Sequence, residues 1–199
     1  MRRATITRRT TETQITIRLA VDGQGTATVT TGLPFLDHML VLLATHAGWT
    51  LSVKAQGDLA VDVHHTNEDV GLVLGQALLQ ALDGGRGIRR FGWAYVPMED
   101  ALARVVVDIC GRPKLLVRDQ RKPRRALTGS GTSYQWRDLE HCLESLVRTA
   151  KLTVHVDLFA GDDLHHTAEA VMKALGRALH QAAERNGRGR RIPSSKGVL

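Results

Sequence analysis

The stretch from His64 to Leu78 reads HHTNEDVGLVLGQAL, and the stretch from His165 to Leu179 reads HHTAEAVMKALGRAL. Upstream of each lies a second matching pair, LDHMLVLLATHAGWTLSV at residues 36–53 and LEHCLESLVRTAKLTVHV at residues 139–156. Histidines, glutamates and apolar residues coincide in one register, so the chain carries an internal duplication. We predict one domain over residues 1–199, made of two repeats at about 1–88 and 89–186 that are followed by a C-terminal tail.

The apolar pattern predicts the same order of strands and helices in each repeat. Short runs that alternate between apolar and polar residues predict strands, and longer runs with helical spacing predict helices. The expected strands are residues 14–20, 26–31, 51–55, 92–98, 103–109, 115–118 and 153–158, and the expected helices are residues 35–47, 67–82, 139–150 and 167–185. The fold class is therefore α+β, a duplicated β-β-β-α-β-α half with the helices packed between two sheets. The basic segment 118–133 contains proline and glycine and is expected to be a loop.

The composition is typical of a cytoplasmic globular protein. The 199 residues are 43% hydrophobic and 24% charged, and no apolar run approaches the roughly 18 residues that span a membrane. The first residues are basic but lack the apolar segment of a secretory signal, and two cysteines are too few for a disulfide framework. We expect a cytoplasmic protein without a membrane partner.

The positive charge suggests an anionic partner. The net charge is +7, and arginine and lysine gather at residues 2–9, 112–125 and 185–196. Nucleic acid is one candidate, but only 4% of residues are aromatic, so stacking platforms for bases are scarce. The sequence also lacks a helix-turn-helix or RNA-binding signature. A phosphate-bearing small molecule accounts for the cations as well, and we expect it, rather than nucleic acid, as the partner.

The repeated motif His-His-x-x-Glu points to metal binding. Each copy is predicted at a junction between strand and helix, where the second His and the Glu, three residues apart, would share a helix face. Imidazole and carboxylate without thiolate suit a divalent ion such as Mn²⁺. Adjacent side chains diverge in extended chain, so we expect two metal centres, each with one His from one repeat and His plus Glu from the other. The partner repeat could belong to the same chain or to a neighbouring subunit.

Six blocks along the chain resemble those of a known enzyme family. The blocks are LPFLDHML, DVHHTNEDVGLVLGQAL, RFGWAYVPMEDALA, DICGRP, HHTAEAVMKALGRAL and IPSSKGVL. In this order, over residues 12–199, they resemble the monofunctional imidazoleglycerol-phosphate dehydratases. The resemblance implies a ribosomal protein S5 domain 2-like fold, two Mn²⁺ per active site, and a homo-oligomer of 24 subunits built from trimers. The chain departs from the family at Glu99-Asp100, where the family usually has Asp before Glu, and we assign neither residue a role.

Matching motifs carry the family's site residues onto this sequence. The implied metal ligands are His38, His64, His65, Glu68, His141, His165, His166 and Glu169. The implied substrate-binding residues are Glu12, His38, His46, Arg90, Arg112, His165, Lys173, Ser194, Ser195 and Lys196, of which Glu12 and His46 are also expected to be catalytic. Without the resemblance, Arg90 would be an ordinary exposed charge, Lys173 a helix ion pair with Glu169, and the C-terminal Ser-Ser-Lys-Gly a frayed end.

The implied reaction converts D-erythro-imidazoleglycerol phosphate to imidazole acetol phosphate in histidine biosynthesis, by removing water from C2 and C3. No carbonyl group acidifies the C2 hydrogen, so the imidazole ring must supply the activation. Two bound cations would favour the imidazolate form of the ring, which can expel the C3 hydroxide, and we expect Glu12 to take part in proton transfer. The alternative is a non-catalytic metal-storage or metal-sensing assembly, which would have no need for phosphate-binding cations at the metal.

Overall fold

The structure is a computed structural model, and it describes residues 2–122, 126–127, 133–187, 189 and 191–197. The first repeat contains β1 (Arg3–Arg9), β2 (Thr13–Ala20), β3 (Thr26–Thr30), α1 (Pro34–Ala47), β4 (Thr50–Gly57) and α2 (His64–Leu82). After a 3-10 turn at Asp83–Gly85, the second repeat contains β5 (Phe91–Met98), β6 (Ala101–Ile109), β7 (Lys114–Asp119), α3 (Trp136–Ala150), β8 (Leu152–Ala160) and α4 (Leu164–Ala183). Both repeats therefore have the predicted order β-β-β-α-β-α.

Each repeat forms one four-stranded sheet, and the two sheets have the same topology. The strand orders are β1-β2-β4-β3 and β5-β6-β8-β7. The first three strands in each order pair antiparallel, whereas β3 joins β4, and β7 joins β8, in parallel. A parallel pair needs a crossover connection, and α1 and α3 provide it. The helix of each crossover thereby comes to lie on the inner face of its sheet.

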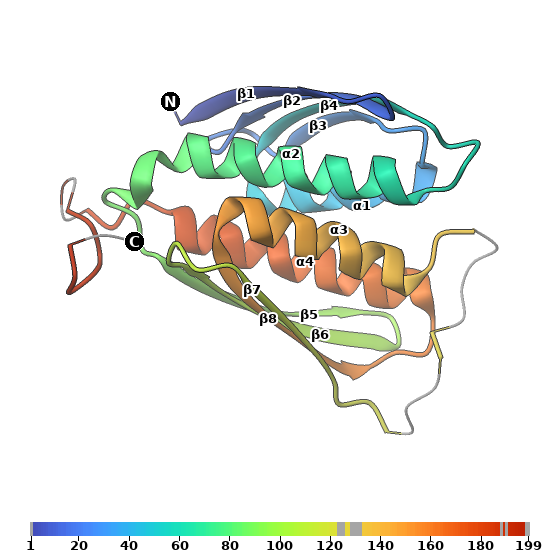
Figure 1. The fold of residues 1–199 in the computed structure, drawn as a ribbon. Coiled ribbons are helices and arrows are strands. Elements are labelled where there is room, and N and C mark those ends of the chain that lie inside the picture. The colour runs from blue at the N-terminus through green and yellow to red at the C-terminus, as the bar shows by residue number, and fades with distance from the viewer. Residues whose placement is uncertain (1, 123–125, 128–132, 188, 190, 198–199) are drawn as a thin grey trace.

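The four helices lie between the two sheets, as predicted (Figure 1). Their main contacts run across the repeats, because α2 packs on α3 and α1 packs on α4. Gly75 on α2 and Gly176 on α4 permit this close approach, since a side chain at either would collide with the backbone of the partner helix, near Leu146 and Leu43 respectively. One apolar core consequently runs from sheet to sheet through the helices. Among the described helices, none is long and apolar enough to cross a membrane.

The structure corrects the sequence prediction in three respects. Strand β1 was missed, because its alternating Arg and Thr residues hide the core positions Ala4 and Ile6. Helices α2 and α4 begin three residues before the predicted starts, since the His-His-Thr segment is itself their first turn. Part of the expected loop 118–133 is also strand, because β7 continues to Asp119; residues 123–125 and 128–132 lie outside the described residues.

Candidate metal centres and substrate site

The α1–α4 cluster comprises His38, His165 and Glu169, whose ligand atoms lie within 4.8 Å of one another. Oε1 of Glu169 is 2.7 Å from Nε2 of His38 and 2.9 Å from Nε2 of His165. Lys173 approaches the other carboxylate oxygen to 2.5 Å. Burial raises the pKa of Glu169, but hydrogen bonds from Lys173 and from the two imidazoles outweigh it and bring the pKa to about 2. The carboxylate is therefore ionised and can bind a cation.

The α2–α3 cluster comprises His64, Glu68 and His141, also with ligand atoms within 4.8 Å of one another. The two imidazoles stack with their centroids 4.4 Å apart. Glu68 is 3.9 Å from Nε2 of His64, and its other oxygen accepts a 2.8 Å hydrogen bond from Arg148 on α3. His64 and His141 line a cleft of about 540 Å³, whose wall includes Asp138. This cluster has the same donors as the other but a looser geometry.

Each cluster combines the two repeats of the same chain. The α1–α4 cluster takes His38 from the first repeat and His plus Glu from the second, and the α2–α3 cluster does the reverse. The sequence pairs the second His of each motif with the Glu, whereas in each cluster it is the first His that lies beside the Glu. Because each motif is helical from its first His, residues His64 and Glu68, or His165 and Glu169, are four apart and lie on one face.

The second histidine of each motif turns away from its own cluster. Nδ1 of His65 lies 2.9 Å from a carboxylate oxygen of Asp58, and Nδ1 of His166 lies 2.7 Å from one of Asp100. These hydrogen bonds raise the pKa of both His65 and His166. They also fix the orientation of each ring, so that Nε2 is the nitrogen left for another partner.

Two acidic turns face His65 and His166, which we call the outer histidines. Glu12, in the turn between β1 and β2, lies 3.8 Å from Nε2 of His65. Glu99, in the turn between β5 and β6, lies 3.5 Å from Nε2 of His166. Sequence reasoning assigned Glu99 and Asp100 no role, yet the structure places both at His166. Their position in the chain could have indicated a role at the site, because the acidic pair follows the first strand of its repeat, as Glu12 does.

His46 lies on α1 two helical turns beyond His38 and belongs to neither cluster. It lines a cleft of about 560 Å³ together with Trp93, Arg177 and His180. Burial lowers the pKa of His46, and the positive charges of Lys173 and Arg177 lower it further. The imidazole is thus favoured in its neutral form, which can accept a hydrogen bond or a proton.

The expected phosphate-binding residues other than Lys173 gather at the opposite end of α4. Arg90 forms a two-pronged ion pair with Asp108, at 2.7 and 3.1 Å, and donates a 3.0 Å hydrogen bond to the carbonyl of Pro193. Pro193 leads directly into the tail, whose expected binding residues are Ser194, Ser195 and Lys196. Arg112 follows β6, whose last residue, Ile109, donates its backbone N–H to the carbonyl of Arg90. Arg90, Arg112 and the tail therefore share one end of the molecule.

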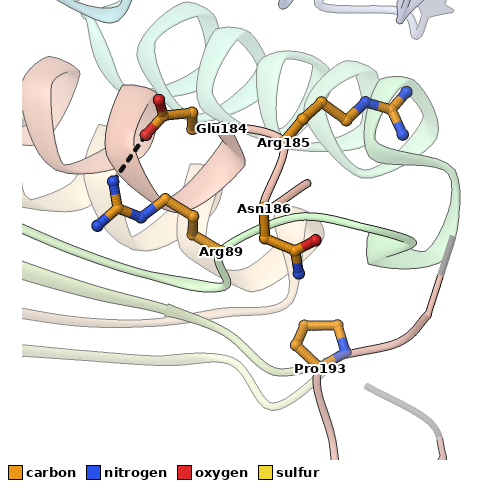
Figure 2. Close-up of a pocket in the computed structure, with 5 residues that line it drawn as sticks. All are labelled: Arg89, Glu184, Arg185, Asn186 and Pro193. Carbon is orange, nitrogen blue, oxygen red and sulfur yellow. Dashed lines mark hydrogen bonds and ion pairs between the residues drawn. The ribbon is translucent and has the colours of Figure 1, made fainter. Parts of the chain in front are cut away.

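A basic pocket of about 450 Å³ lies at this end (Figure 2). Arg89 pairs with Glu184 at 2.8 Å on one wall, and Arg185, Asn186 and Pro193 complete the lining. In Figure 2, Glu184, just after α4, lies across from Pro193, with Arg89 and Asn186 between them. Its cations add to the positive charge around Arg90.

Within one chain, the α1–α4 cluster and the basic end that holds Arg90 and the tail are too far apart to bind one small substrate together. The backbone N–H of Arg90 donates to the carbonyl of Ala182, and Glu169 lies thirteen residues before Ala182 on α4. At a rise of 1.5 Å per residue, the separation is about 20 Å. Lys173 is the expected phosphate ligand that does lie beside a metal cluster.

Comparisons with known proteins agree with the duplicated fold and its histidine motifs. The family model described as imidazoleglycerol-phosphate dehydratase matches residues 31–179. Relatives of that name from Aromatoleum aromaticum and Thermus thermophilus are 48% and 47% identical to this chain, and each alignment covers 100% of both proteins.

Solved structures give the same result. The dehydratase of Staphylococcus aureus superposes with a TM-score of 0.78 at 37% identity, covering 90% of this chain and 97% of its own. The enzyme from Pyrococcus furiosus superposes with a TM-score of 0.81 at 32% identity, covering 98% and 100%. Fold, motifs and full-length similarity together show that the chain belongs to the imidazoleglycerol-phosphate dehydratase family of lyases.

Proposed function

We propose that this chain dehydrates imidazoleglycerol phosphate in the cytoplasm, at a di-manganese site shared between copies of the chain. Dehydratase activity in histidine biosynthesis and a phosphorylated substrate are those of its family. Membership of an enzyme family argues against the metal-storage alternative. The observation that carries the finer proposal is the pair of clusters, each with two imidazoles and one carboxylate drawn from both repeats.

The donor set of each cluster fits one Mn²⁺. Two neutral nitrogens and a carboxylate oxygen suit this ion, and donor atoms within 4.8 Å of one another can surround it. Three donors leave positions open for further ligands. We assign those positions to His65 and His166 of neighbouring copies, because each ring faces away from its own cluster and is oriented by a carboxylate. The proposed ligands are His38, His64, His65, Glu68, His141, His165, His166 and Glu169.

The chain's own side chains supply acid–base chemistry and orientation. When bound, the two ions would favour the imidazolate form of the substrate ring and so help to expel the C3 hydroxide. Glu12 is proposed to move the proton at C2, since its turn places it beside an outer histidine. His46, kept neutral beside Lys173 and Arg177, is proposed to bind the substrate and assist proton transfer.

The residues proposed to bind the phosphate, apart from Lys173, are contributed by another copy of the chain. Arg90, Arg112 and the tail beyond residue 186 lie about 20 Å from the α1–α4 cluster of their own chain. A substrate whose ring lies at the metal ions can reach these groups if a neighbouring copy contributes them, while Lys173 acts from the same copy. A homo-oligomer of 24 subunits built from trimers would provide such neighbours.

Mixed oligomers test this sharing. One copy carries His165→Ala, which breaks the cluster, and the other lacks residues 194–199, which removes the tail. Each parent should show little turnover at low substrate concentration, whereas co-refolded mixtures should recover low-KM activity, because intact clusters then meet intact tails. The matched control mixes His165→Ala with His38→Ala, which damage the same cluster, and should stay inactive. Failure of the first mixture to recover would mean that cluster and tail act within one chain.

A further inference from the structure

The turn that carries Glu12 is closed by its own hydrogen bonds. The backbone N–H of Thr10 donates to the carbonyl of Thr13 at 2.9 Å. The hydroxyl of Thr10 accepts from the backbone N–H groups of Glu12 and Thr13, at 3.1 and 2.9 Å. Because these bonds fix the backbone on both sides of Glu12, the direction of its side chain depends on how the whole turn is held against the rest of the molecule.

One buried side chain ties this turn to the helix that carries the metal-ligand candidates. Asp69, on α2, is 7% exposed and follows Glu68 directly. Its Oδ2 accepts a 2.5 Å hydrogen bond from the hydroxyl of Thr13, the residue after Glu12. Its Oδ1 accepts a 2.8 Å hydrogen bond from Nε of Arg8, at the end of β1. A single carboxylate therefore binds both strands that flank the acidic turn.

The second repeat holds its acidic turn differently. The residue that corresponds to Asp69 is Ala170, which has no carboxylate to offer. There the turn itself provides the acceptor, because Asp100 binds His166 and the backbone N–H of Asp162. Since the duplicated fold can be built without an aspartate at this place in α2, its presence in the first repeat has a local purpose.

We infer that Asp69 is a positioning residue for the dehydration reaction, which holds Glu12 at a fixed distance from the metal-binding face of α2. The inference rests on the proposed role of Glu12. Asp69 reaches Glu12 through the Thr13 bond and the closed turn, and the Arg8 bond neutralises its buried charge. Misplacement of a reacting group by about 1 Å can cost up to about 10²-fold in rate.

The test measures kcat, KM, metal content and melting temperature for Asp69→Asn, which keeps the size and removes the charge. We expect kcat to fall by about tenfold or more, with KM changed less than kcat and with two metal ions still bound per chain. Thr13→Val cuts the tether and leaves the Arg8 pair in place, so it should reduce kcat in the same way if Asp69→Asn does not fold. Asp22→Asn is the matched control, because Asp22, just after β2, also pairs with an arginine, Arg2, just before β1. It should lower the melting temperature and leave kcat unchanged.

A double-mutant cycle with Glu12→Gln separates positioning from general stability. If Asp69 acts through Glu12, adding Asp69→Asn to Glu12→Gln causes no further loss of kcat, whereas a purely structural role lowers the residual rate by the same factor again. Near-normal turnover of Glu12→Gln would overturn the proposed role of Glu12, and the positioning role with it. A strongly impaired Glu12→Gln beside an unimpaired Asp69→Asn and Thr13→Val would overturn the positioning role alone.

Discussion

The two candidate metal centres have the same three donors, but their surroundings differ. In the α1–α4 cluster, the Glu169 side chain is 8% exposed and touches both histidines and Lys173. In the α2–α3 cluster, the Glu68 side chain is 29% exposed, its histidine contact is longer, and its cation is an arginine on the neighbouring helix. The two repeats thus keep the same candidate donors, while the residues that support these donors differ. We expect the α1–α4 centre to be the more rigid and the tighter of the two.

Metal removal should have the largest effect. A chelator should abolish turnover completely, and Mn²⁺ should restore it, because the proposed chemistry needs both centres occupied. If the α1–α4 centre binds its ion more tightly, titration with chelator should release one ion per chain before the other. The first ion should leave the α2–α3 centre. Metal-binding isotherms of His141→Ala and His38→Ala would identify which step each variant removes. The assembly should also loosen as metal leaves, since ligands are proposed to come from more than one copy. Full turnover by metal-free protein would contradict the mechanism.

Deletion of residues 194–199 should raise KM by roughly 10²-fold. The serine hydroxyls and the lysine ammonium of the tail would donate charge-assisted hydrogen bonds to the phosphate, and two such bonds at about 1.5–3 kcal/mol each correspond to that factor or more. The α1–α4 cluster lies at the other end of α4, and neither cluster includes a residue of the tail, so the metal content should stay at two ions per chain. Unchanged KM and kcat would move the phosphate site onto Arg90, Arg112 and Lys173.

Replacement of the two glutamates should change the pH dependence of stability unequally. The pKa of Glu169 is lowered from 4.5 to about 2, so its ionised form stabilises the metal-free fold above pH 4.5, and this contribution is lost as the pH falls from about 4.5 to about 2. Glu169→Gln removes that part of the pH dependence. Denaturant unfolding between about pH 5 and pH 2 should therefore show a shallower loss of stability for Glu169→Gln than for the wild type. Glu68→Gln makes the same chemical change in the more exposed cluster, and an equally large change there would erase the distinction between the centres.

Arg148→Ala should have the smallest effect. Its side chain is 56% exposed and pairs with Glu68 at 2.8 Å, and exposed ion pairs contribute about 0–1 kcal/mol. The Mn²⁺ affinity of the α2–α3 centre should change by less than about tenfold, with the α1–α4 centre untouched. Isothermal titration of the variant against the wild type measures this, and a loss of the ion from both centres would show that the two are coupled.

The sequence predicted what depends on repetition and on local pattern. The alignment of the two His-His-x-x-Glu segments was sufficient to predict the duplicated halves, the helices between two sheets, and clusters that mix the repeats. The sequence did not predict strand β1, because arginine and threonine occupy its outer face and make the segment look like a basic, unstructured tail. The sequence did not show which His of each motif joins the Glu, because both lie within one turn of the Glu once the helix starts at the motif.

Long-range placement could not be predicted from pattern alone. Spacing does not show that Arg90 lies beside the carbonyl of Pro193, or that both lie a helix length from Glu169. Nor does it show that Asp69 reaches across to Thr13. These facts depend on the register of β1 and β5 against the helices, which packing sets. The ligand roles themselves remain predictions that the variants above can test.

The packing of helices across the repeats is the packing expected of a symmetric dimer of half-length chains. Because α2 lies on α3 and α1 lies on α4, a half-length chain folded alone would leave its helices uncovered, whereas two such chains would cover each other as a symmetric dimer. That dimer would have contained two identical clusters from the start, each built from both partners. In the single chain the two halves can differ without disturbing the shared helical layer, as they do at Lys173 and Asp69, whose counterparts are Leu72 and Ala170. A chain divided near Gly87 into two co-expressed fragments should therefore reassemble through the same helix contacts and restore both clusters.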